Sequence, residues 1–390
     1  MVTAYKNARV LDARGEYRGE VYVRNGRILH AGTDGAGIPA DEEIDVLGML
    51  LMPAFIDCHC HLRDPGFPKK ETMETGMRAA LKGGFATLCA MANTDPVCET
   101  PELVERNHKR AEELRLTNLI QAAAAGIGLG DGTPTDYEAL SKVTRVITND
   151  GKTIFSDAFM ENLLRASTKY GFVISTHCQP ERAIVARDLA LLKKAGGNLH
   201  VGHISRSETA RMIREAKAAG LKLTCEVTPH HLIGCDSDYK VNPPLRTYAD
   251  TRALIDAVAD GTVGCFATDH APHTQEDKQN GMAGISNIEY AMQVYLKVCS
   301  ENAIPLTRFS ELLSANPAKI LGLDAGLIEP GMRADIVIVD PDMKDVIRRN
   351  TMISRSNNTP FDGVEVQGRV LKTIVGGELR YEYGQARTGR

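Results

Sequence analysis

A regular alternation of short apolar runs with helix-forming segments is the feature that most limits how this chain can fold. The runs are rich in β-branched residues and stand between helical segments, which is typical of strands buried in a parallel sheet. We predict strands at 51–57, 86–93, 119–125, 145–150, 172–178, 199–204, 221–229 and 263–269. Residues 205–219, which lie between two of them, have helical spacing, with Ser205 at the start and Gly220 after the end.

This alternation predicts a (β/α)8 TIM barrel in the α/β class. Eight strands that alternate with helices over about 270 residues match the size and order of such a barrel. A doubly wound open sheet is the rival architecture. It usually carries a glycine-rich phosphate loop after its first strand, and the sequence has no such loop there. We therefore expect the barrel to span residues 51–324.

The two ends of the chain show a different pattern, in which apolar and polar residues alternate. Residues 20–24 and 27–30 flank Asn25-Gly26, a dipeptide typical of a tight β-hairpin turn. Residues 333–340 and 369–382 repeat this pattern near the other terminus. We expect residues 1–50 and 325–390 to form one small β-sandwich domain beside the barrel.

Composition narrows the classes of partner. A net charge of −4 gives no general attraction to nucleic acid or to anionic membranes, and no apolar run approaches the roughly 20 residues of a membrane span. The nine cysteines are scattered through apolar segments, and the first residues lack the profile of a secretion signal. These features indicate reduced thiols and a cytoplasmic protein that acts on a small molecule.

Metal-binding side chains stand at the ends of the expected strands. His59 and His61 are two residues apart on an extended segment, so their side chains point the same way. The other candidates end strands four, five, six and eight, in the order Asp150, His177, His203 and Asp269. Because active sites of such barrels lie at the C-terminal ends of the strands, we expect all six side chains to meet in one site.

Six candidate ligands exceed the three that one catalytic zinc usually takes, and they favour a two-metal site. We expect two zinc ions per chain, with manganese or cobalt as alternatives for such nitrogen and oxygen ligands. Metal ions lower the pKa of bound water to about 7 and so supply the hydroxide that attack on an unactivated amide requires. Asp269 is our candidate for the general acid and base that passes the proton to the departing nitrogen.

The same residues lie in motifs that resemble those of dihydroorotases of the longer bacterial type, members of the amidohydrolase superfamily. The matching segments are 57–66 (DCHCHLRDPG), Asn93 in ANTDP, 150–151 (DG), 177–178 (HC), 200–203 (HVGH), 226–232 (EVTPHHL), 242–246 (NPPLR) and 267–273 (ATDHAPH). The resemblance covers the whole expected barrel and, more loosely, both ends. Two segments, 177–203 and 274–285, are shorter than is usual in that family.

The resemblance implies the reversible cyclisation of N-carbamoyl-L-aspartate to dihydroorotate, a step of pyrimidine biosynthesis. It implies that the six side chains above are the metal ligands. It also implies a substrate-binding set, which comprises Arg63, Asn93, His273 and Asn242. The chemistry of Arg63 agrees with this, because a planar guanidinium can hold a carboxylate through two hydrogen bonds.

Two other functions stay open. Hydantoinases and allantoinases share the histidine pair and the final aspartate, but they bridge their metals with a carboxylated lysine where this chain has Asp150; Lys152 keeps that alternative open. The second is a non-catalytic dihydroorotase-like subunit that scaffolds aspartate transcarbamoylase. Such subunits lose metal histidines, whereas all the candidates are present here. A homodimer and a complex with aspartate transcarbamoylase are the expected assemblies.

The remaining histidines of these segments are expected to be structural. His200 is out of phase with His203 on the same strand, so the two cannot both point at the metals. His230 and His231 are expected to support the loop after strand seven. Cys58 and Cys60 alternate with the metal histidines and are expected to pack on the other side of their strand.

Overall fold

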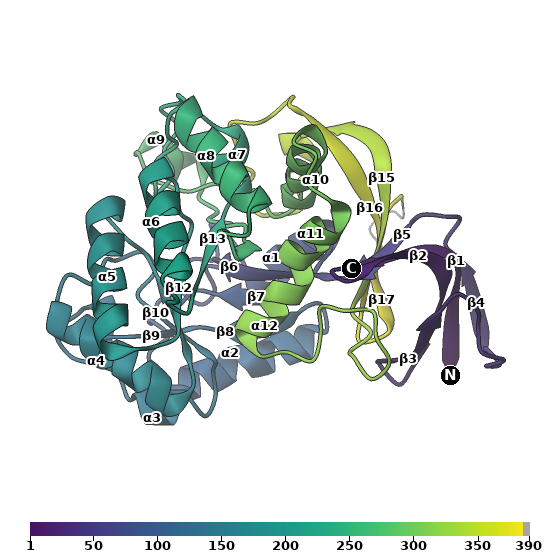
Figure 1. Cartoon of the computed structure of the whole chain (residues 1–390), viewed down its shortest axis with the longest axis horizontal. Coiled ribbons are helices and arrows are strands. Elements are labelled where there is room, and N and C mark those ends of the chain that lie inside the picture. The colour runs from purple at the N-terminus through teal and green to yellow at the C-terminus, as the bar shows by residue number, and fades with distance from the viewer. Residues whose placement is uncertain (385–390) are drawn as a thin grey trace.

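The strands between residues 55 and 266 form a closed parallel ring in a computed structural model that describes residues 1–384. Figure 1 shows the whole chain. One run has the order β6 (Phe55–Cys60), β7 (Phe85–Ala90) and β8 (Asn118–Gln121). The other has the order β9 (Ala123–Ala124), β10 (Val146–Thr148), β11 (Val173–Thr176), β12 (Leu199–Val201), β13 (Leu223–Val227) and β14 (Cys265–Phe266). Only Ala122 separates β8 from β9, so together these two supply the third strand of the ring.

The ring closes between its last and first strands. Cys60 and His270 form a parallel bridge, and the backbone N–H of His61 donates to the carbonyl of His270 over 2.8 Å. The backbone N–H of Asp269 donates to the carbonyl of His59 over 2.9 Å. The expected (β/α)8 barrel is therefore confirmed. The line along which its last strand pairs with its first, which we call the seam, lies beside candidate metal ligands.

The helices and helical turns follow the strands along the chain. Their bounds are α1 (Met73–Lys82), α2 (Pro101–Leu114), η1 (Ile127–Leu129), α3 (Tyr137–Leu140), α4 (Asp157–Tyr170), α5 (Glu181–Ala195), α6 (Ser207–Ala218), α7 (Pro229–Ile233), α8 (Tyr248–Ala259), α9 (Gln275–Gln279), α10 (Ala291–Glu301), α11 (Leu306–Ser310), η2 (Glu311–Ala315), α12 (Asn316–Leu321) and η3 (Arg349–Thr351). None of the helices in residues 1–384 is both long and apolar enough to span a membrane.

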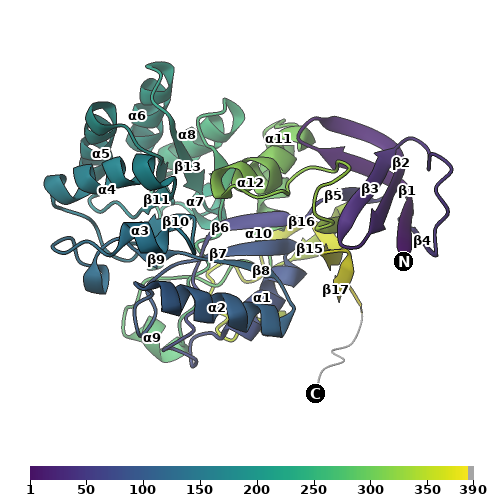
Figure 2. The same ribbon diagram turned by 90° about the horizontal axis from the view of Figure 1, so that it is seen from below.

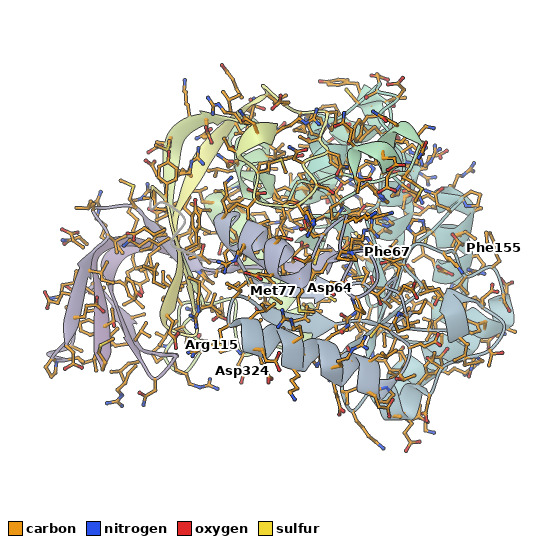
Figure 3. All side chains as sticks on the ribbon, turned by 180° about the vertical axis from the view of Figure 1, so that it is seen from behind. Asp64, Phe67, Met77, Arg115, Phe155 and Asp324 are labelled. Atoms are coloured by element: carbon orange, nitrogen blue, oxygen red, sulfur yellow. The ribbon has the colours of Figure 1, made fainter. Side chains whose placement is uncertain are left out.

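Helix α1 shows how local sequence and packing fix these elements. The side chain of Thr72 accepts a hydrogen bond from the backbone N–H of Thr75 and caps the first turn. Met73 and Met77 are one turn apart and fully buried, so they hold the helix against the barrel. Asp64 accepts a hydrogen bond from the backbone N–H of Met73 and thereby ties the loop after β6 to the start of α1 (Figure 3).

The terminal strands form one eight-stranded sheet, as the patterns at both ends indicated. Its order is β17-β16-β15-β5-β1-β2-β3, and β4 pairs with β1. The bounds are β1 (Val2–Asp12), β2 (Gly15–Arg24), β3 (Arg27–Gly32), β4 (Glu42–Asp45), β5 (Leu50–Pro53), β15 (Ile336–Val346), β16 (Glu365–Val375) and β17 (Glu378–Glu382). Asn25 and Gly26 both have positive φ and close the predicted hairpin between β2 and β3.

The expected first barrel strand, 51–57, is wrong in its bounds. Leu50–Pro53 is β5 of the terminal sheet, paired with β1 and β15, and the barrel strand begins only at Phe55. The whole run is buried, so its apolar pattern does not mark where one strand ends and the next begins. The domain limits at residues 50/51 and 324/325 stay predictions.

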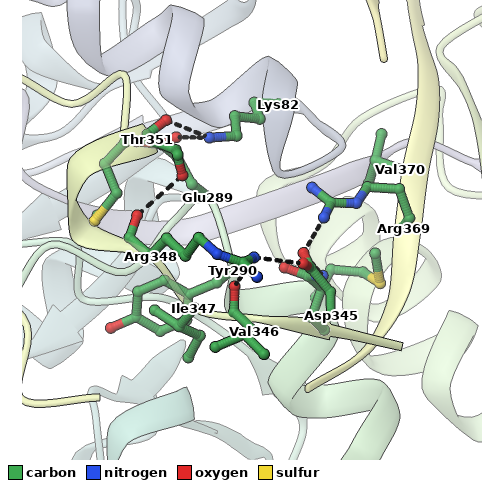
Figure 4. Close-up of a pocket in the computed structure, with 13 residues that line it drawn as sticks. Lys82, Glu289, Tyr290, Asp345, Val346, Ile347, Arg348, Thr351, Arg369 and Val370 are labelled. Atoms are coloured by element: carbon green, nitrogen blue, oxygen red, sulfur yellow. Dashed lines mark hydrogen bonds and ion pairs between the residues drawn. The ribbon is translucent and has the colours of Figure 1, made fainter. Parts of the chain in front are cut away.

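The terminal sheet and the barrel meet over a group of charged residues. In Figure 2 the purple and yellow strands of the sheet lie at one end of the molecule, and helices α4, α5 and α6 lie at the other. Figure 4 shows the junction around a small cavity of about 40 Å³. Lys82 on α1 lies 2.8 Å from the carboxylate of Glu289 and donates to the carbonyl of Thr351. Asp345 on β15 pairs with Arg348 and with Arg369 on β16.

Candidate metal centre

Six side chains from five strand ends converge around Asp150, which follows β10. Atom Oδ1 of Asp150 lies 3.2 Å from Nε2 of His59, which is on β6. Its Oδ2 lies 3.3 Å from Nε2 of His61. His177 follows β11 and His203 follows β12, and one nitrogen of each lies 3.4 Å from Oδ1 of Asp150. Thus every expected histidine faces this carboxylate.

Asp269, which follows β14, completes the cluster from the opposite side of the ring seam. Its Oδ1 lies 3.2 Å from Nε2 of His61 and 3.7 Å from Nε2 of His59. The ligand atoms form two compact groups that share Asp150. These groups are His59, His61 and Asp150, and Asp150, His177 and His203. Oδ1 of Asp150 faces ligand atoms of both groups, and its Oδ2 faces His61. A carboxylate shared by two ligand groups in this way suits a two-cation site.

The unsatisfied atoms of the cluster show that these residues fit a metal. Nε2 of His59 and Oδ1 of Asp150 are buried, and neither has a hydrogen-bond partner within residues 1–384. Leaving a buried polar atom unpaired costs free energy, and each such atom in a folded protein calls for an explanation. A cation between the imidazoles and the carboxylate would satisfy both atoms. The donor set of nitrogen and oxygen atoms is one that zinc, manganese and cobalt accept.

Hydrogen bonds from outside the cluster orient three of its four imidazoles. Nδ1 of His59 lies 2.6 Å from a carboxylate oxygen of Glu226, so Nδ1 donates to Glu226 and Nε2 is the atom that would offer its lone pair to a bound metal. His61 is held in the same way by Oδ1 of Asn93, at 2.9 Å. His177 uses the opposite nitrogen, because its Nδ1 faces Asp150 and its Nε2 lies 3.0 Å from the amide of Asn242.

Burial and charge act in opposite directions on the carboxylates. Burial alone would raise the pKa of Asp150, but the charge of His59 and hydrogen bonds from two further imidazoles outweigh it, so its pKa lies well below the usual value. Burial also acts to raise the pKa of Asp269. The hydrogen bond from His61 and nearby imidazole charges again prevail, and the pKa is lowered. Both side chains are therefore carboxylates at neutral pH.

Three non-glycine residues at these strand ends have a strained backbone. Arg63, His203 and Asp269 have φ values of 58°, 28° and 44°. Residues other than glycine seldom adopt positive φ, and each such residue costs of order 1 kcal/mol or more. Three such residues beside one cluster indicate that tertiary packing holds these side chains in place against local preference.

Arg63 and His273 form a second group next to the cluster. Nη2 of Arg63 lies 3.3 Å from Nε2 of His273, and Nε of Arg63 donates to the carbonyl of Pro272. On the other side of the ring, Nζ of Lys70 lies 3.2 Å from Nδ1 of His273. Burial and the charges of these two cations lower the pKa of His273 to about 3. A neutral imidazole thus stands between two cations.

Asn93 lies beside the metal cluster, and a close approach of the backbone at Gly151 limits its position. A Cβ added at Gly151 would come within 3.0 Å of Nδ2 of Asn93, and Gly151 has a φ of 87°. Because Oδ1 of Asn93 is occupied by His61, the Nδ2 end is the part of the amide that can meet a ligand. Asp150-Gly151 therefore places a ligand carboxylate and leaves room for the Asn93 amide.

Residues that the sequence left ambiguous are now placed. Lys152 is exposed and donates to the carbonyl of Gly128, so it does not point into the cluster. His200 points to the other oxygen of Glu226, at 2.9 Å, as a structural residue would. His230 and His231 contact Asn287 and the carbonyl of Pro243, respectively. None of these three histidines belongs to the two candidate ligand groups around Asp150.

Glu226 is the site residue that the sequence analysis missed. It is fully buried on β13 and accepts hydrogen bonds from the rings of His59 and His200 and from the backbone N–H of His203. The available signal was a single carboxylate in the otherwise apolar run LTCEV, because a buried charge needs partners. Lys70 was missed as well.

The comparisons with known proteins agree with this fold. Residues 50–380 match the model of the amidohydrolase family. A dihydroorotase of Clostridium botulinum is 36% identical over 97% of this chain and 98% of its own length. One from a Geobacillus species is 37% identical over 99% of this chain and 100% of its own.

Solved structures with the same fold carry other names. The L-hydantoinase of Arthrobacter aurescens superposes with a TM-score of 0.90 at 23% identity, over 98% of this chain and 96% of its own. A dihydropyrimidinase of Brevibacillus agri gives 0.89 at 22% identity, over 99% of this chain and 96% of its own. At such identities the likeness establishes the fold and leaves the substrate to the site itself.

Proposed function

This chain is a member of the amidohydrolase family, and we propose that it acts as a dihydroorotase, which closes N-carbamoyl-L-aspartate to dihydroorotate and reopens the ring. The observation that carries this proposal is the pairing of Arg63 with a neutral His273 beside the metal cluster. Such a group suits a substrate with a carboxylate that takes no part in the reaction. Dihydroorotate carries one, whereas hydantoin does not.

The contacts of His273 support a carboxylate ligand on their own. A neutral imidazole has one N–H and one acceptor nitrogen, whereas Arg63 and Lys70 can only donate. The acceptor nitrogen of the ring can therefore take a hydrogen bond from only one of these two cations. The N–H of the ring faces the other cation and has no acceptor there. A carboxylate placed there would accept from the ring N–H and from the guanidinium. Nδ2 of Asn93 would add a third donor to the substrate.

In this proposal Asp150 would be shared by two metal ions, one of which His59 and His61 would hold and the other His177 and His203. When bound, the ions supply Lewis acidity that polarises the amide carbonyl and makes water acidic. Asp269 takes a proton from the attacking water and gives it to the ring nitrogen as the C–N bond breaks. In the cyclisation direction it takes the proton from that nitrogen. Its contact with His61 holds the carboxylate in position for this transfer.

Asn242 supports the cluster in a way that differs from the expected substrate contact. Nδ2 of Asn242 lies 3.0 Å from Nε2 of His177. If Nδ1 of His177 binds a metal, its Nε2 carries the proton, and the amide accepts from it once it is flipped so that its oxygen faces the ring. We therefore propose that Asn242 orients His177. A contact between Asn242 and the substrate stays a prediction.

The hydantoinase reading has less support from the site. A bridging carboxylated lysine would have to come from Lys152, which is exposed and bonded to Gly128, while Asp150 already stands at the bridging place. The non-catalytic reading is disfavoured because all six candidate ligands are present and oriented. Two zinc ions per chain, the cytoplasmic location, the homodimer and the complex with aspartate transcarbamoylase stay predictions.

A substrate panel tests the proposal. The purified protein is incubated with dihydroorotate, hydantoin and allantoin, and ring opening is measured. We expect turnover of dihydroorotate, and a fall of about 100-fold in kcat/KM for Arg63→Met, because a charged hydrogen-bonded pair is removed. Arg211→Met on the exposed face of α6 is the control and should match the wild type. Turnover of hydantoin alone would refute the assignment.

Elemental analysis tests the metal centre separately from turnover. Wild type should carry about two metal ions per chain at full loading. Asp150→Ala and His177→Ala should both carry fewer, because Asp150 faces both groups and His177 faces one. Metal content equal to wild type in both variants would contradict the site as described.

A further inference from the structure

A basic pocket of about 510 Å³ lies beside the proposed substrate clamp, and the reaction described above does not use it. Its charged lining comes from separate segments: the loop after β6, helix α9, and the chain from η3 toward β16. The cationic residues that line the pocket are Lys69, Lys278, Arg349 and Arg355, and we call this space the basic pocket. No aspartate or glutamate is among its lining residues.

The four cations of the basic pocket lack ion pairs. Among residues 1–384, no carboxylate lies within ion-pair distance of Lys69, Lys278, Arg349 or Arg355. Lys70, the next residue to Lys69, shows the contrast, because its Nζ lies 3.5 Å from a carboxylate oxygen of Asp277. Uncompensated positive charge on several sides of one cavity favours a negatively charged occupant.

Lys278 is the most constrained of these cations. Its ammonium donates to the carbonyls of Lys240 and Gly284, over 2.7 and 2.9 Å, and lies 4.2 Å from the centre of the Tyr239 ring. It is partly buried, and this burial together with the nearby charge of Lys240 lowers its pKa to about 8. The contacts fix the position of the charge, but none of them neutralises it.

The floor of the basic pocket is a fixed set of buried polar groups. Oδ1 of Asn358 accepts from the backbone N–H of His273 over 3.1 Å and from the hydroxyl of Ser286 over 2.9 Å. Its Nδ2 donates to the carbonyl of Gly284 over 3.0 Å. These contacts hold the Asn358 side chain in one orientation, so this part of the lining needs little ordering when a ligand binds.

We propose that the basic pocket binds a small anion that carries two negative charges, such as a dicarboxylate or a phosphate compound. Cations from separate segments can contact two anionic groups, and charge-assisted hydrogen bonds to such groups are among the strongest in proteins. His273 lines this pocket and also contacts Arg63 of the clamp, so the pocket adjoins the proposed active site. The proposal adds a binding site to the proposed function.

Binding of inorganic phosphate at pH 7, where Lys278 is still charged, tests this proposal without any turnover. Wild type is compared by titration calorimetry with Lys278→Gln/Arg355→Gln, and metal content and thermal unfolding are measured on both. We expect the dissociation constant to rise at least tenfold in the variant, since two charge-assisted contacts are lost. Lys142→Gln/Arg211→Gln removes two exposed cations elsewhere and should bind as wild type does.

Two results would overturn the proposal. One is equal phosphate binding by wild type and the pocket variant, which would place the anion at the metal centre or on the general surface. The other is no binding by wild type at concentrations up to about 10 mM, which would correspond to a free energy weaker than about −3 kcal/mol. Neither result depends on the substrate, so failure of the dihydroorotase assignment is recognised separately.

A kinetic arm then distinguishes two sources of the anion, both of which support the proposal. N-carbamoyl-L-aspartate has two carboxylates and dihydroorotate has one. If the pocket recruits the open-chain substrate, the pocket variant should raise KM for N-carbamoyl-L-aspartate more than for dihydroorotate, with kcat unchanged, and phosphate should compete. If the pocket holds a separate phosphorylated ligand, both KM values should stay the same, and phosphate should still bind at saturating dihydroorotate.

Discussion

At the scale of single residues, the centre depends on side chains that never touch a metal. His59 presents Nε2 to Asp150 only because Glu226 holds its Nδ1, and Asn93 does the same for His61. Such outer contacts fix both the tautomer and the direction of a ligand. Glu226 is the stronger case, because one carboxylate contacts two imidazole rings and the backbone beside a third.

We predict that Glu226→Gln weakens metal binding about 10- to 100-fold while the chain still folds, because the amide keeps the shape and loses the charge that His59 and His200 contact. Metal affinity is measured by competition with a chelator. Glu215→Gln on the exposed face of α6 is the control. Equal affinities for wild type and Glu226→Gln would show that Glu226 has no part in orienting the ligands.

Gly151→Ala should show separately how backbone strain affects stability and how a displaced Asn93 amide affects substrate binding. A Cβ at a φ of 87° costs about 1 kcal/mol of stability, and here it also presses on the Asn93 amide. Gly171→Ala has a φ of 77° with nothing within 4 Å and is the matched control. Urea unfolding should show similar losses for both, whereas only Gly151→Ala should raise KM for dihydroorotate. If KM is unchanged, Asn93 does not bind the substrate.

The clustering of the candidate metal ligands could be predicted from the sequence because each stands at the end of a recognisable strand. Their partners could not, since His59 and Glu226 are 167 positions apart and Lys70 and His273 are 203 apart. No local pattern encodes which buried carboxylate meets which imidazole. The positions of the strand ends predict which side chains cluster. The contacts that orient these side chains are visible only in the folded chain.

At the scale of elements, the start of α6 shows where local signals fail. Ser205 was expected to begin this helix, but it bonds to Glu181 instead, and the helix begins at Ser207. The backbone N–H and the hydroxyl of Ser207 both donate to Asp250, which belongs to α8. A neighbouring helix thus caps α6, and a sequence window that covers only α6 contains no trace of this partner.

Asp250→Ala should lower the free energy of unfolding by about 2 kcal/mol, because it removes the cap of α6 and the capping box of α8 together. Asp256→Ala, an exposed position on the same helix, is the control and should change stability by less than about 1 kcal/mol. Urea denaturation at neutral pH measures both. Equal losses in the two variants would contradict the shared cap.

The same variant has a predicted pH dependence. Burial acts to raise the pKa of Asp250, but hydrogen bonds from Ser207 and Thr247 prevail, and the pKa lies below its ordinary value of 3.8. A carboxylate with a lowered pKa stabilises the fold above that ordinary value and loses this contribution as the pH falls through the folded pKa. The stability difference between wild type and Asp250→Ala should therefore be constant from pH 7 to about 5 and shrink below about 4.

At the scale of the whole molecule, the junction between barrel and terminal sheet rests on a buried charge. Glu289 is almost fully buried, pairs with Lys82 and accepts from the backbone of Ile353 and Ser354. These contacts bind the barrel to the chain segment that leads into β16. Removing one partner of a buried pair leaves an uncompensated charge, which costs more than the pair itself contributes.

We predict that Lys82→Met lowers the free energy of unfolding of the full chain by about 3 kcal/mol. The double variant Lys82→Met/Glu289→Gln should recover part of this loss, because no charge is then left unpaired. Arg78→Met removes an exposed pair with Glu74 on the same helix and should cost less than about 1 kcal/mol. Equal losses in Lys82→Met and Arg78→Met would show that the junction does not depend on this pair.

The seam of the barrel has a consequence for assembly. His59 and His61 come from the first strand of the ring and Asp269 from beyond the last, and the backbone bonds that join these strands run beside them. A chain whose final strand has not docked presents only part of the proposed ligand set. Cations would then bind tightly only to chains whose barrel is closed. By mass action, this binding would shift the equilibrium from chains with an undocked final strand toward the closed barrel.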